Sequence, residues 1–237
     1  MFNARSFHGL QFSAVALLVL SACKADPPAP TTSTAATGDD LSGSYKITSA
    51  TNPGGVGGYA GGVQLTRQGD HYTVDWAIAN TPPYKGVAIV EGQTLGVGWG
   101  TGQNYGVAVY KVDGGTLTGK WATFLTQGKV GTEKLSGPTG LSGEYQIVEA
   151  TTPGGTKGYA GTVTITPQGE TYAVTWKLAN ESYGGVGILR GNVFVVGWGT
   201  GGGGAGVVSY GIGGRKLDGT WAQPGGKALG TEVLAKN

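Results

Sequence analysis

The chain has 237 residues, of which 48 are glycine, and its formal net charge at pH 7 is +2. Charged residues make up 13% of it, about half the usual share, and neither half carries the basic stripe of a nucleic-acid-binding protein. The glycines do not recur at every third position, which excludes collagen, and no sustained helical periodicity follows residue 23. The composition therefore indicates an all-β protein with no nucleic-acid partner.

Residues 1–22 are predicted to be a lipoprotein signal peptide. Arg5 precedes an apolar run, residues 12–20, that is too short for a transmembrane helix but typical of a secretory signal. The run leads into Leu20-Ser21-Ala22-Cys23, which resembles a bacterial lipobox, and Cys23 is the only cysteine. We expect Cys23 to be lipidated, with palmitate as one of the acyl chains, and to anchor the protein to a membrane. An ordinary secretory signal with an incidental cysteine is the alternative.

Residues 23–40 are predicted to be a disordered tether. This segment is rich in proline, threonine and alanine and has no large apolar side chain, so it buries too little surface to fold. Lys24 follows the cysteine, whereas enteric bacteria retain lipoproteins with aspartate at that position in the inner membrane. Resemblance to that sorting rule predicts the outer membrane, at its periplasmic or its surface face. In a cell without an outer membrane, the same signal predicts the cell surface.

The remainder of the chain contains one repeat twice, over residues 41–137 and 141–237. The segment 41–47 returns as 141–147, and the six tryptophans form three pairs: Trp76 and Trp176, Trp99 and Trp198, Trp121 and Trp221. Each copy is expected to be one structural unit. Residues 136–142 are expected to link the two units.

Each copy is predicted to contain eight short antiparallel strands, because alternating runs are separated by glycine-rich turns about every ten residues. We expect strands near 43–50, 57–66, 71–79, 84–91, 94–100, 105–112, 116–123 and 130–136 in the first copy. The second copy repeats them near 143–150, 157–166, 171–179, 183–190, 193–199, 206–212, 216–223 and 229–235. Eight such strands can close into an up-and-down barrel, which leaves no exposed edge. The predicted fold class is therefore all-β, with two tandem eight-stranded antiparallel meander barrels.

Alternation within a strand separates a core face from a wet face. In the segment 71–76, the side chains expected to face the core are Tyr72, Val74 and Trp76. Those expected to face water are His71, Thr73 and Asp75. The second copy keeps the first set and replaces all three members of the other set. An interior of eight strands is wide enough for packed side chains or for one small ligand.

The motifs shared by both copies resemble those of a known family. They are Gly-x-Tyr-x-Ile/Val, Pro-Gly-Gly, Tyr-x-Gly-x-Val, Gly-x-x-Tyr-x-Val-x-Trp, Gly-Trp-Gly, Leu-x-Gly-x-Trp-Ala and Gly-Thr-Glu. They resemble exported bacterial Gly/Trp-rich β-repeat lipoproteins that are often labelled fibronectin-binding. The resemblance covers both copies and implies no particular binding residue. At the level of fold, the meander is similar to the avidin and lipocalin barrels.

Glu133 and Glu232 are the polar positions that most suggest a site. In a strand, each shares a face with a leucine two residues later, so each carboxylate is expected in the interior or at the end of a barrel. A buried carboxylate there either contacts a ligand or accepts hydrogen bonds from tyrosine, tryptophan or backbone donors. Retention in both copies favours the structural role.

The aromatic residues are the other candidates. Core packing explains most of them, but Trp99 and Trp198 lie between glycines beside glycine-rich loops and are expected at the barrel rim. We include Tyr59 and Tyr159, near the start of the second expected strand of each copy, in the same candidate ligand-binding set.

Catalysis has little support in the sequence. The chain after Cys23 has one histidine, His71, which is replaced by threonine in the second copy, and it has no Ser-His-Asp set and no cluster of metal-ligand type. We therefore expect no enzyme, no metal and no cofactor. The sequence predicts a membrane-anchored module that binds a small ligand, a glycan or another protein at the cell envelope. The alternatives are an adhesin-like protein with fully packed barrels and binding loops, and more remotely an enzyme that uses glutamate and tyrosine.

Overall fold

A computed structural model describes residues 40–155, 157–200 and 204–237. The described residues form sixteen β-strands, and none of their segments is a helix long and apolar enough to cross a membrane. The all-β prediction is confirmed. The predicted signal peptide at 1–22, the lipidation site Cys23 and the tether at 23–40, apart from Asp40, lie outside the described residues.

The strands follow the predicted segments closely. They are β1 (Gly43–Thr51), β2 (Gly61–Gln68), β3 (His71–Ile78), β4 (Tyr84–Glu91), β5 (Thr94–Gly100), β6 (Tyr105–Asp113), β7 (Thr116–Thr123), β8 (Gly131–Ser136), β9 (Gly143–Thr151), β10 (Gly161–Gln168), β11 (Thr171–Leu178), β12 (Ser182–Arg190), β13 (Val193–Gly199), β14 (Gly206–Gly213), β15 (Lys216–Ala222) and β16 (Gly230–Lys236). The largest difference is the later start of β2 and β10. In the first copy Gly57 has a φ of 70°, a conformation that interrupts an extended strand.

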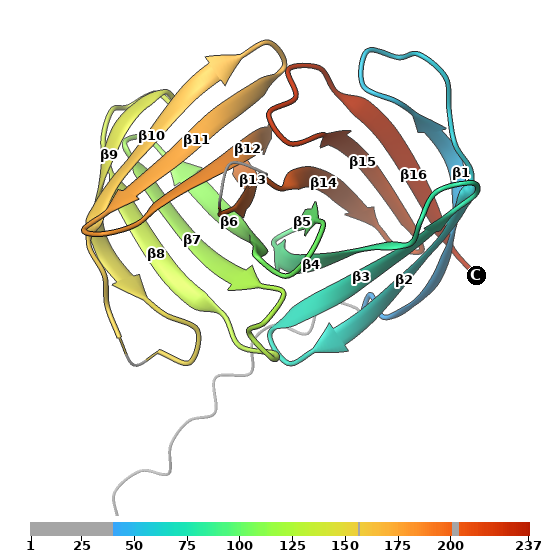
Figure 1. Ribbon diagram of the computed structural model, residues 1–237, viewed down its shortest axis with the longest axis horizontal. Helices are drawn as coiled ribbons and strands as arrows, with labels where there is room; N and C mark the ends of the chain where they lie inside the picture. The colour runs from blue at the N-terminus through green and yellow to red at the C-terminus, as the bar shows by residue number, and fades with distance from the viewer. Residues whose placement is uncertain (1–39, 156, 201–203) are drawn as a thin grey trace, which may run out of the picture. The chain divides into compact units, whose positions relative to one another are not determined.

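The strands close into two eight-stranded antiparallel barrels, as predicted (Figure 1). One, which we call the continuous barrel, is formed by β6 to β13 without interruption in the sequence. The other, the split barrel, is formed by β1 to β5 together with β14 to β16. The chain thus passes from the split barrel to the continuous barrel between β5 and β6, and returns between β13 and β14.

The barrels do not coincide with the sequence repeats, which corrects the expected barrel boundaries of 41–137 and 141–237. Each copy gives five strands to one barrel and three strands to the other. The segment expected to link two units instead joins β8 to β9, which pair as neighbours inside the continuous barrel. Pairing of sequential strands is the common outcome for a short connection, and it leaves β16 to close the split barrel against β1.

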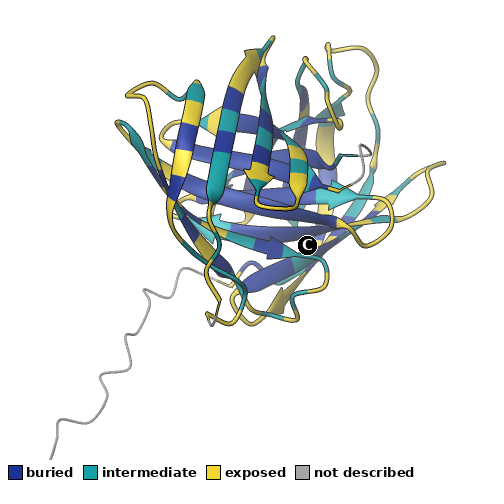
Figure 2. Cartoon of the chain, turned by 60° about the vertical axis from the view of Figure 1, so that its left-hand side comes forward, coloured by how far each residue is buried: buried dark blue, intermediate teal, exposed yellow. Residues whose placement is uncertain are grey.

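The two barrels share a core along their facing walls. The outward side chains of β4, β6, β12, β13 and β14 meet there in one buried cluster, which includes Val87, Ile89, Val107, Val109 and Val195. Strands β4 and β5 contact β6, β5 also contacts β13, and β12 and β13 contact β14. The central residues of these strands are buried, because one face lines a barrel and the other face lines the junction. Figure 2 shows such long buried stretches of strand, in dark blue, in the interior of the molecule.

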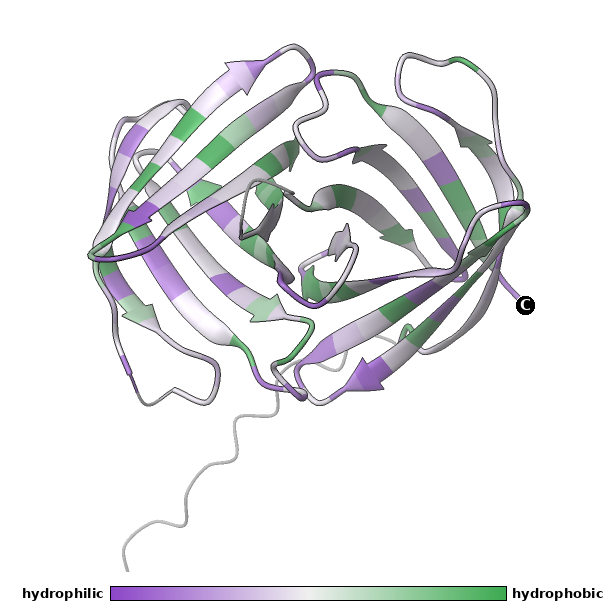
Figure 3. Cartoon of the chain, viewed as in Figure 1, coloured by the Kyte–Doolittle hydropathy of each residue, from purple (hydrophilic) through white to green (hydrophobic). Residues whose placement is uncertain are grey.

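Each barrel also has its own interior core. The side chains predicted to face inward, including Tyr72, Val74 and Trp76, are buried there. Hydrophilic and hydrophobic residues alternate along β2 and β3, as Figure 3 shows. His71 differs from its prediction, since it is 2% exposed rather than on a wet face. The loop after β7 covers this end of β3, where the Asp70 N–H donates to the Gly128 carbonyl at 2.8 Å.

Candidate ligand sites in the two barrels

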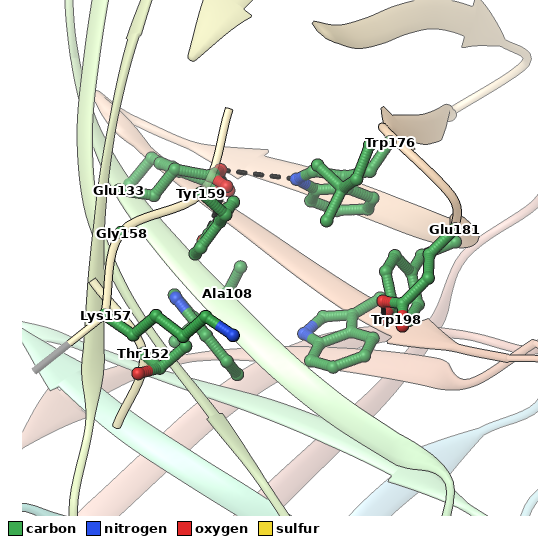
Figure 4. Close-up of a pocket in the computed structure, with 13 residues that line it drawn as sticks. Ala108, Glu133, Thr152, Lys157, Gly158, Tyr159, Trp176, Glu181 and Trp198 are labelled. Atoms are coloured by element: carbon green, nitrogen blue, oxygen red, sulfur yellow. Dashed lines mark hydrogen bonds between the residues drawn. The ribbon is translucent and has the colours of Figure 1, made fainter. Parts of the chain in front are cut away.

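A buried glutamate lies inside each barrel. In the continuous barrel Glu133, on β8, is 3% exposed and accepts hydrogen bonds at both oxygens. Tyr159 donates to Oε1 at 2.8 Å, and Trp176 Nε1 donates to Oε2 at 3.2 Å (Figure 4). Tyr110 also donates to Oε2. The structural role expected for Glu133 is therefore present, with three donors from three different segments.

The split barrel contains the counterpart of this network. Glu232, on β16, is 2% exposed and accepts hydrogen bonds at Oε1 from Tyr210 and from Trp76 Nε1, the latter at 3.2 Å. Its Oε2 is buried and has no hydrogen-bond partner among the described residues. Burial, and after it the neighbouring Glu232 carboxylate, raises the pKa of Tyr59, but no hydrogen bond of normal geometry joins the Tyr59 hydroxyl to Oε2. The two networks therefore differ at one carboxylate oxygen.

Burial governs the protonation of these groups. It raises the pKa of Glu133 and of Glu232 above the ordinary value, while the tyrosine and tryptophan donors act in the opposite direction. Burial and the neighbouring carboxylate raise the pKa of Tyr110 and of Tyr210 well above the ordinary value for tyrosine, so both hydroxyls stay protonated and act as donors. Each hydrogen-bond network thus holds one carboxyl group among neutral tyrosine and tryptophan donors.

Glycines make room for the rim tryptophans. Trp99 on β5 is paired across the sheet with Gly206, and a Cβ at Gly206 would lie 2.1 Å from the Trp99 ring. Trp198 lies in the same way against Gly106, where a Cβ would be 2.6 Å from the ring. The same arrangement holds for two further cross-strand pairs, Trp121 with Gly131 and Trp221 with Gly230. An indole lies flat along the inner wall only because its partner has no side chain.

The aromatic rings form the walls of two cavities, of about 260 Å³ in the continuous barrel and about 360 Å³ in the split barrel. In the split barrel, each ring contacts the next in a series that runs Tyr59, Trp221, Trp99, Tyr84 and Trp76. Successive centroids are 6.1, 6.3, 5.4 and 5.0 Å apart. All of these rings except Trp76 are only half-buried, so the wall is open to the cavity.

The two cavities carry different charged groups. In the continuous barrel Lys157 and Glu181 line the cavity beside Glu133, and Figure 4 shows Lys157 reaching across it toward Trp198. Burial and the hydrogen bond to Glu181 raise the pKa of Tyr183 to about 12. In the split barrel, Glu232 is the single charged residue among the described lining residues. Lys157 and Glu181 were not predicted as site residues, because the first copy has glycine and threonine at the matching places.

The structure brings the predicted ligand-binding residues together in two groups, one in each cavity. Trp99, Glu232 and Tyr59 line the split barrel's cavity, and Trp198, Glu133 and Tyr159 line the cavity of the continuous barrel. Each set mixes the two sequence copies, since Glu232 lies with aromatic residues of the first copy and Glu133 with those of the second. Binding of a ligand by these residues remains a prediction.

Within the described parts of the chain, no group of three or more histidine, cysteine, aspartate or glutamate residues is placed to hold a metal ion. Comparisons with protein-family models, with the curated proteins and with the solved structures found no match to this chain.

Proposed function

We propose that this protein is a membrane-anchored lipoprotein that binds small ligands, without catalysis, in the mouths of its two barrels at the cell envelope. The observation that carries the proposal is the pair of cavities, each with half-buried aromatic rings on its wall and one buried glutamate among its lining residues. Cavities of this size at barrel mouths, largely apolar with a few convergent polar groups, are typical of small-molecule sites.

The chemistry of the lining supports binding rather than turnover. The described lining residues of the two cavities include no histidine and no cysteine, and each buried glutamate is hydrogen-bonded to tyrosine and tryptophan donors. Such a network orients a ligand and accepts its hydrogen bonds. The alternative of an adhesin-like protein with fully packed barrels is less well supported, because the interiors leave space at the mouths.

The membrane part of the proposal rests on the lipobox-like segment that ends at Cys23. Acyl chains at that residue, followed by a tether, would hold the barrels near a membrane surface. Cys23→Ser is expected to abolish incorporation of labelled palmitate and to move the protein from the membrane fraction to the soluble fraction. Unchanged labelling would contradict the anchor.

Native mass spectrometry of the mature chain in mild detergent tests the binding function. The expected spectrum contains a discrete added mass, either as purified or after incubation with the small-molecule fraction of a cell extract. Trp99→Leu and Trp198→Leu, one in each barrel, should each remove part of that added mass. A bare mass under both conditions would contradict small-ligand binding and direct attention to the loops.

A further inference from the structure

The cavity of the split barrel is lined by a buried carboxylate oxygen to which no described residue donates a hydrogen bond of normal geometry, although the Tyr59 hydroxyl lies nearby. Glu232 is 2% exposed and its Oε2 has no hydrogen-bond partner in the described parts of the chain, whereas both oxygens of Glu133 accept hydrogen bonds. A buried carboxylate oxygen without a donor carries a desolvation cost that a bound donor would remove. The missing partner is therefore a hydrogen-bond donor, and a positively charged one would be the most favourable.

The wall of the same cavity is suited to a positive charge. Its five aromatic rings form an unbroken series from Tyr59 to Trp76. The faces of aromatic rings carry negative potential, and cations bind to them within about 6 Å of the ring centre. No lysine, arginine or histidine is among the described lining residues, so no side chain of the lining itself supplies the charge.

The continuous barrel shows the contrast within the same molecule. There, Tyr159 satisfies the second oxygen of Glu133, and Lys157 brings an ammonium group to the cavity. The first copy has Gly57 in place of Lys157, so the split barrel lacks this group. The sites share their aromatic framework and differ in charge, which indicates different ligands.

We propose that the split barrel binds a small organic cation with an N–H donor, such as a primary alkylammonium ion. Its ammonium group would donate to Glu232 Oε2, and its apolar part would lie against Trp99, Trp221 and Tyr84. This inference rests on the proposed ligand-binding function and specifies the chemical class of one ligand.

Cyclohexylamine and its neutral isostere cyclohexanol are suitable probes, because they have nearly the same shape and differ in charge. Calorimetry and tryptophan fluorescence on the full mature chain should give at least a tenfold lower dissociation constant for the amine. Glu232→Gln should remove that preference, while Glu133→Gln, the matched change in the continuous barrel, should leave it unchanged. Tetramethylammonium, which has no N–H, should bind at least tenfold more weakly than the amine.

A second variant keeps the test independent of the glutamate network. Thr81 is exposed at the mouth of the split barrel, so Thr81→Lys adds an ammonium group there with little effect on folding. We expect Thr81→Lys to weaken amine binding at least tenfold, and Thr81→Gln, which has similar length and no charge, to change it little.

The pH dependence supplies a further readout. The groups that face Glu232 are Tyr210 on β14, Trp76 on β3, Tyr84 on β4 and Tyr59 before β2, and all of them are neutral. Acidification protonates Glu232 and should weaken amine binding while leaving cyclohexanol binding unchanged.

The outcomes separate this inference from the proposed function. Equal binding of amine and alcohol, or binding of neither, would overturn the cation site. The added mass in native mass spectrometry would in either case still decide whether the barrels bind small molecules. Amine binding that is unchanged in both Glu232→Gln and Thr81→Lys would also overturn the proposed cation site.

Discussion

At the scale of single residues, the two buried glutamates are the most consequential side chains. Glu133 joins donors from β6, β11 and the loop before β10, so one side chain fixes three segments of the continuous barrel. A buried acceptor of this kind stabilises the fold only while its donors remain paired. The shape of the replacement and its hydrogen-bonding capacity therefore matter more than its charge.

Glu133→Gln is expected to fold, because its amide oxygen can accept from Tyr110 and Trp176 and its amide N–H can donate to the Tyr159 hydroxyl. Glu133→Ala leaves all three groups unpaired in the interior and should lower the free energy of unfolding by at least about 3 kcal/mol. Denaturant unfolding of both variants measures the difference. Equal stability of the alanine and glutamine variants would contradict a structural role for the network.

The raised pKa of both glutamates gives the stability a pH dependence of defined sign. Because the folded-state pKa lies above the ordinary value of 4.5, this contribution is fully present below that pH and is lost as the pH rises through the folded-state pKa. The double variant Glu133→Gln, Glu232→Gln lacks this loss. Its stability relative to the unaltered protein should therefore rise from about pH 4 to about pH 8. Burial lowers the pKa of His71, which gives the stability a pH dependence of the opposite sign. Because His71 is present in both proteins, its contribution cancels in the comparison. A difference between the two proteins that stays constant with pH would show that the carboxyls titrate normally.

At the scale of elements, the sequence predicts the positions of the strands better than it predicts which of their faces are buried. Alternation and turn residues located all sixteen strands, but alternation predicts one buried and one wet face for a strand, as in the segment 71–76. Strands β4, β6, β12, β13 and β14 have apolar residues on both sides, as in Val87-Ala88-Ile89-Val90. Such runs are typical of strands buried on both faces. These runs are visible in the sequence and indicate that a second layer covers the outer face of the strands. They do not indicate which part of the chain forms that layer.

Glycines set the distance between the two walls of the junction. A Cβ at Gly98 would lie 2.1 Å from the carbonyl oxygen of Gly106, and one at Gly197 would lie 2.1 Å from that of Gly206. Backbone atoms cannot yield as a flexible side chain does. The walls therefore meet backbone to backbone at these two points.

Gly98→Ala and Gly197→Ala are each expected to lower the free energy of unfolding by about 3 kcal/mol, because the barrels must move apart. Gly184→Ala is the matched control, since Gly184 is also in a strand and a Cβ there has no atom within 4 Å. That change should be neutral or slightly stabilising. Thermal and denaturant unfolding measure all three variants, and equal effects would show that the walls do not touch at the glycines.

At the scale of the whole molecule, the exchange of strands between barrels is the feature that sequence analysis did not predict. In the split barrel, β5 pairs with β14 through Trp99 with Gly206 and Leu95 with Tyr210. The first copy carries Gly106 and Tyr110 at the matching places of β6, so a barrel closed within one repeat would use equivalent pairs. The residue pattern alone cannot tell whether β5 pairs with β14 or with β6, because both strands offer the same kinds of side chain. Only the connections between the strands distinguish the two pairings. The sites inherit this ambiguity, because each combines residues of both copies.

An isolated repeat tests which force selects the observed pairing. Residues 41–137 contain β1 to β8, which split five to three between the barrels of the intact chain. Whether two copies exchange strands or each copy closes its own barrel, Val87, Ile89, Val107 and Val109 form an apolar outer wall that requires a cover. We therefore expect residues 41–137 to be a dimer, as measured by light scattering after size-exclusion chromatography.

Subunit exchange then separates the two forms of that dimer. If strands are exchanged, a partner leaves only after its barrel opens, so differently tagged dimers should mix as slowly as they unfold. If whole barrels merely associate, mixing should be much faster than unfolding. Val107→Lys should disrupt the second form and leave the first associated through its shared barrels. A stable monomer of residues 41–137 would show that the apolar wall is not what holds the two barrels together, and the pairing would then be determined by the short connection between β8 and β9.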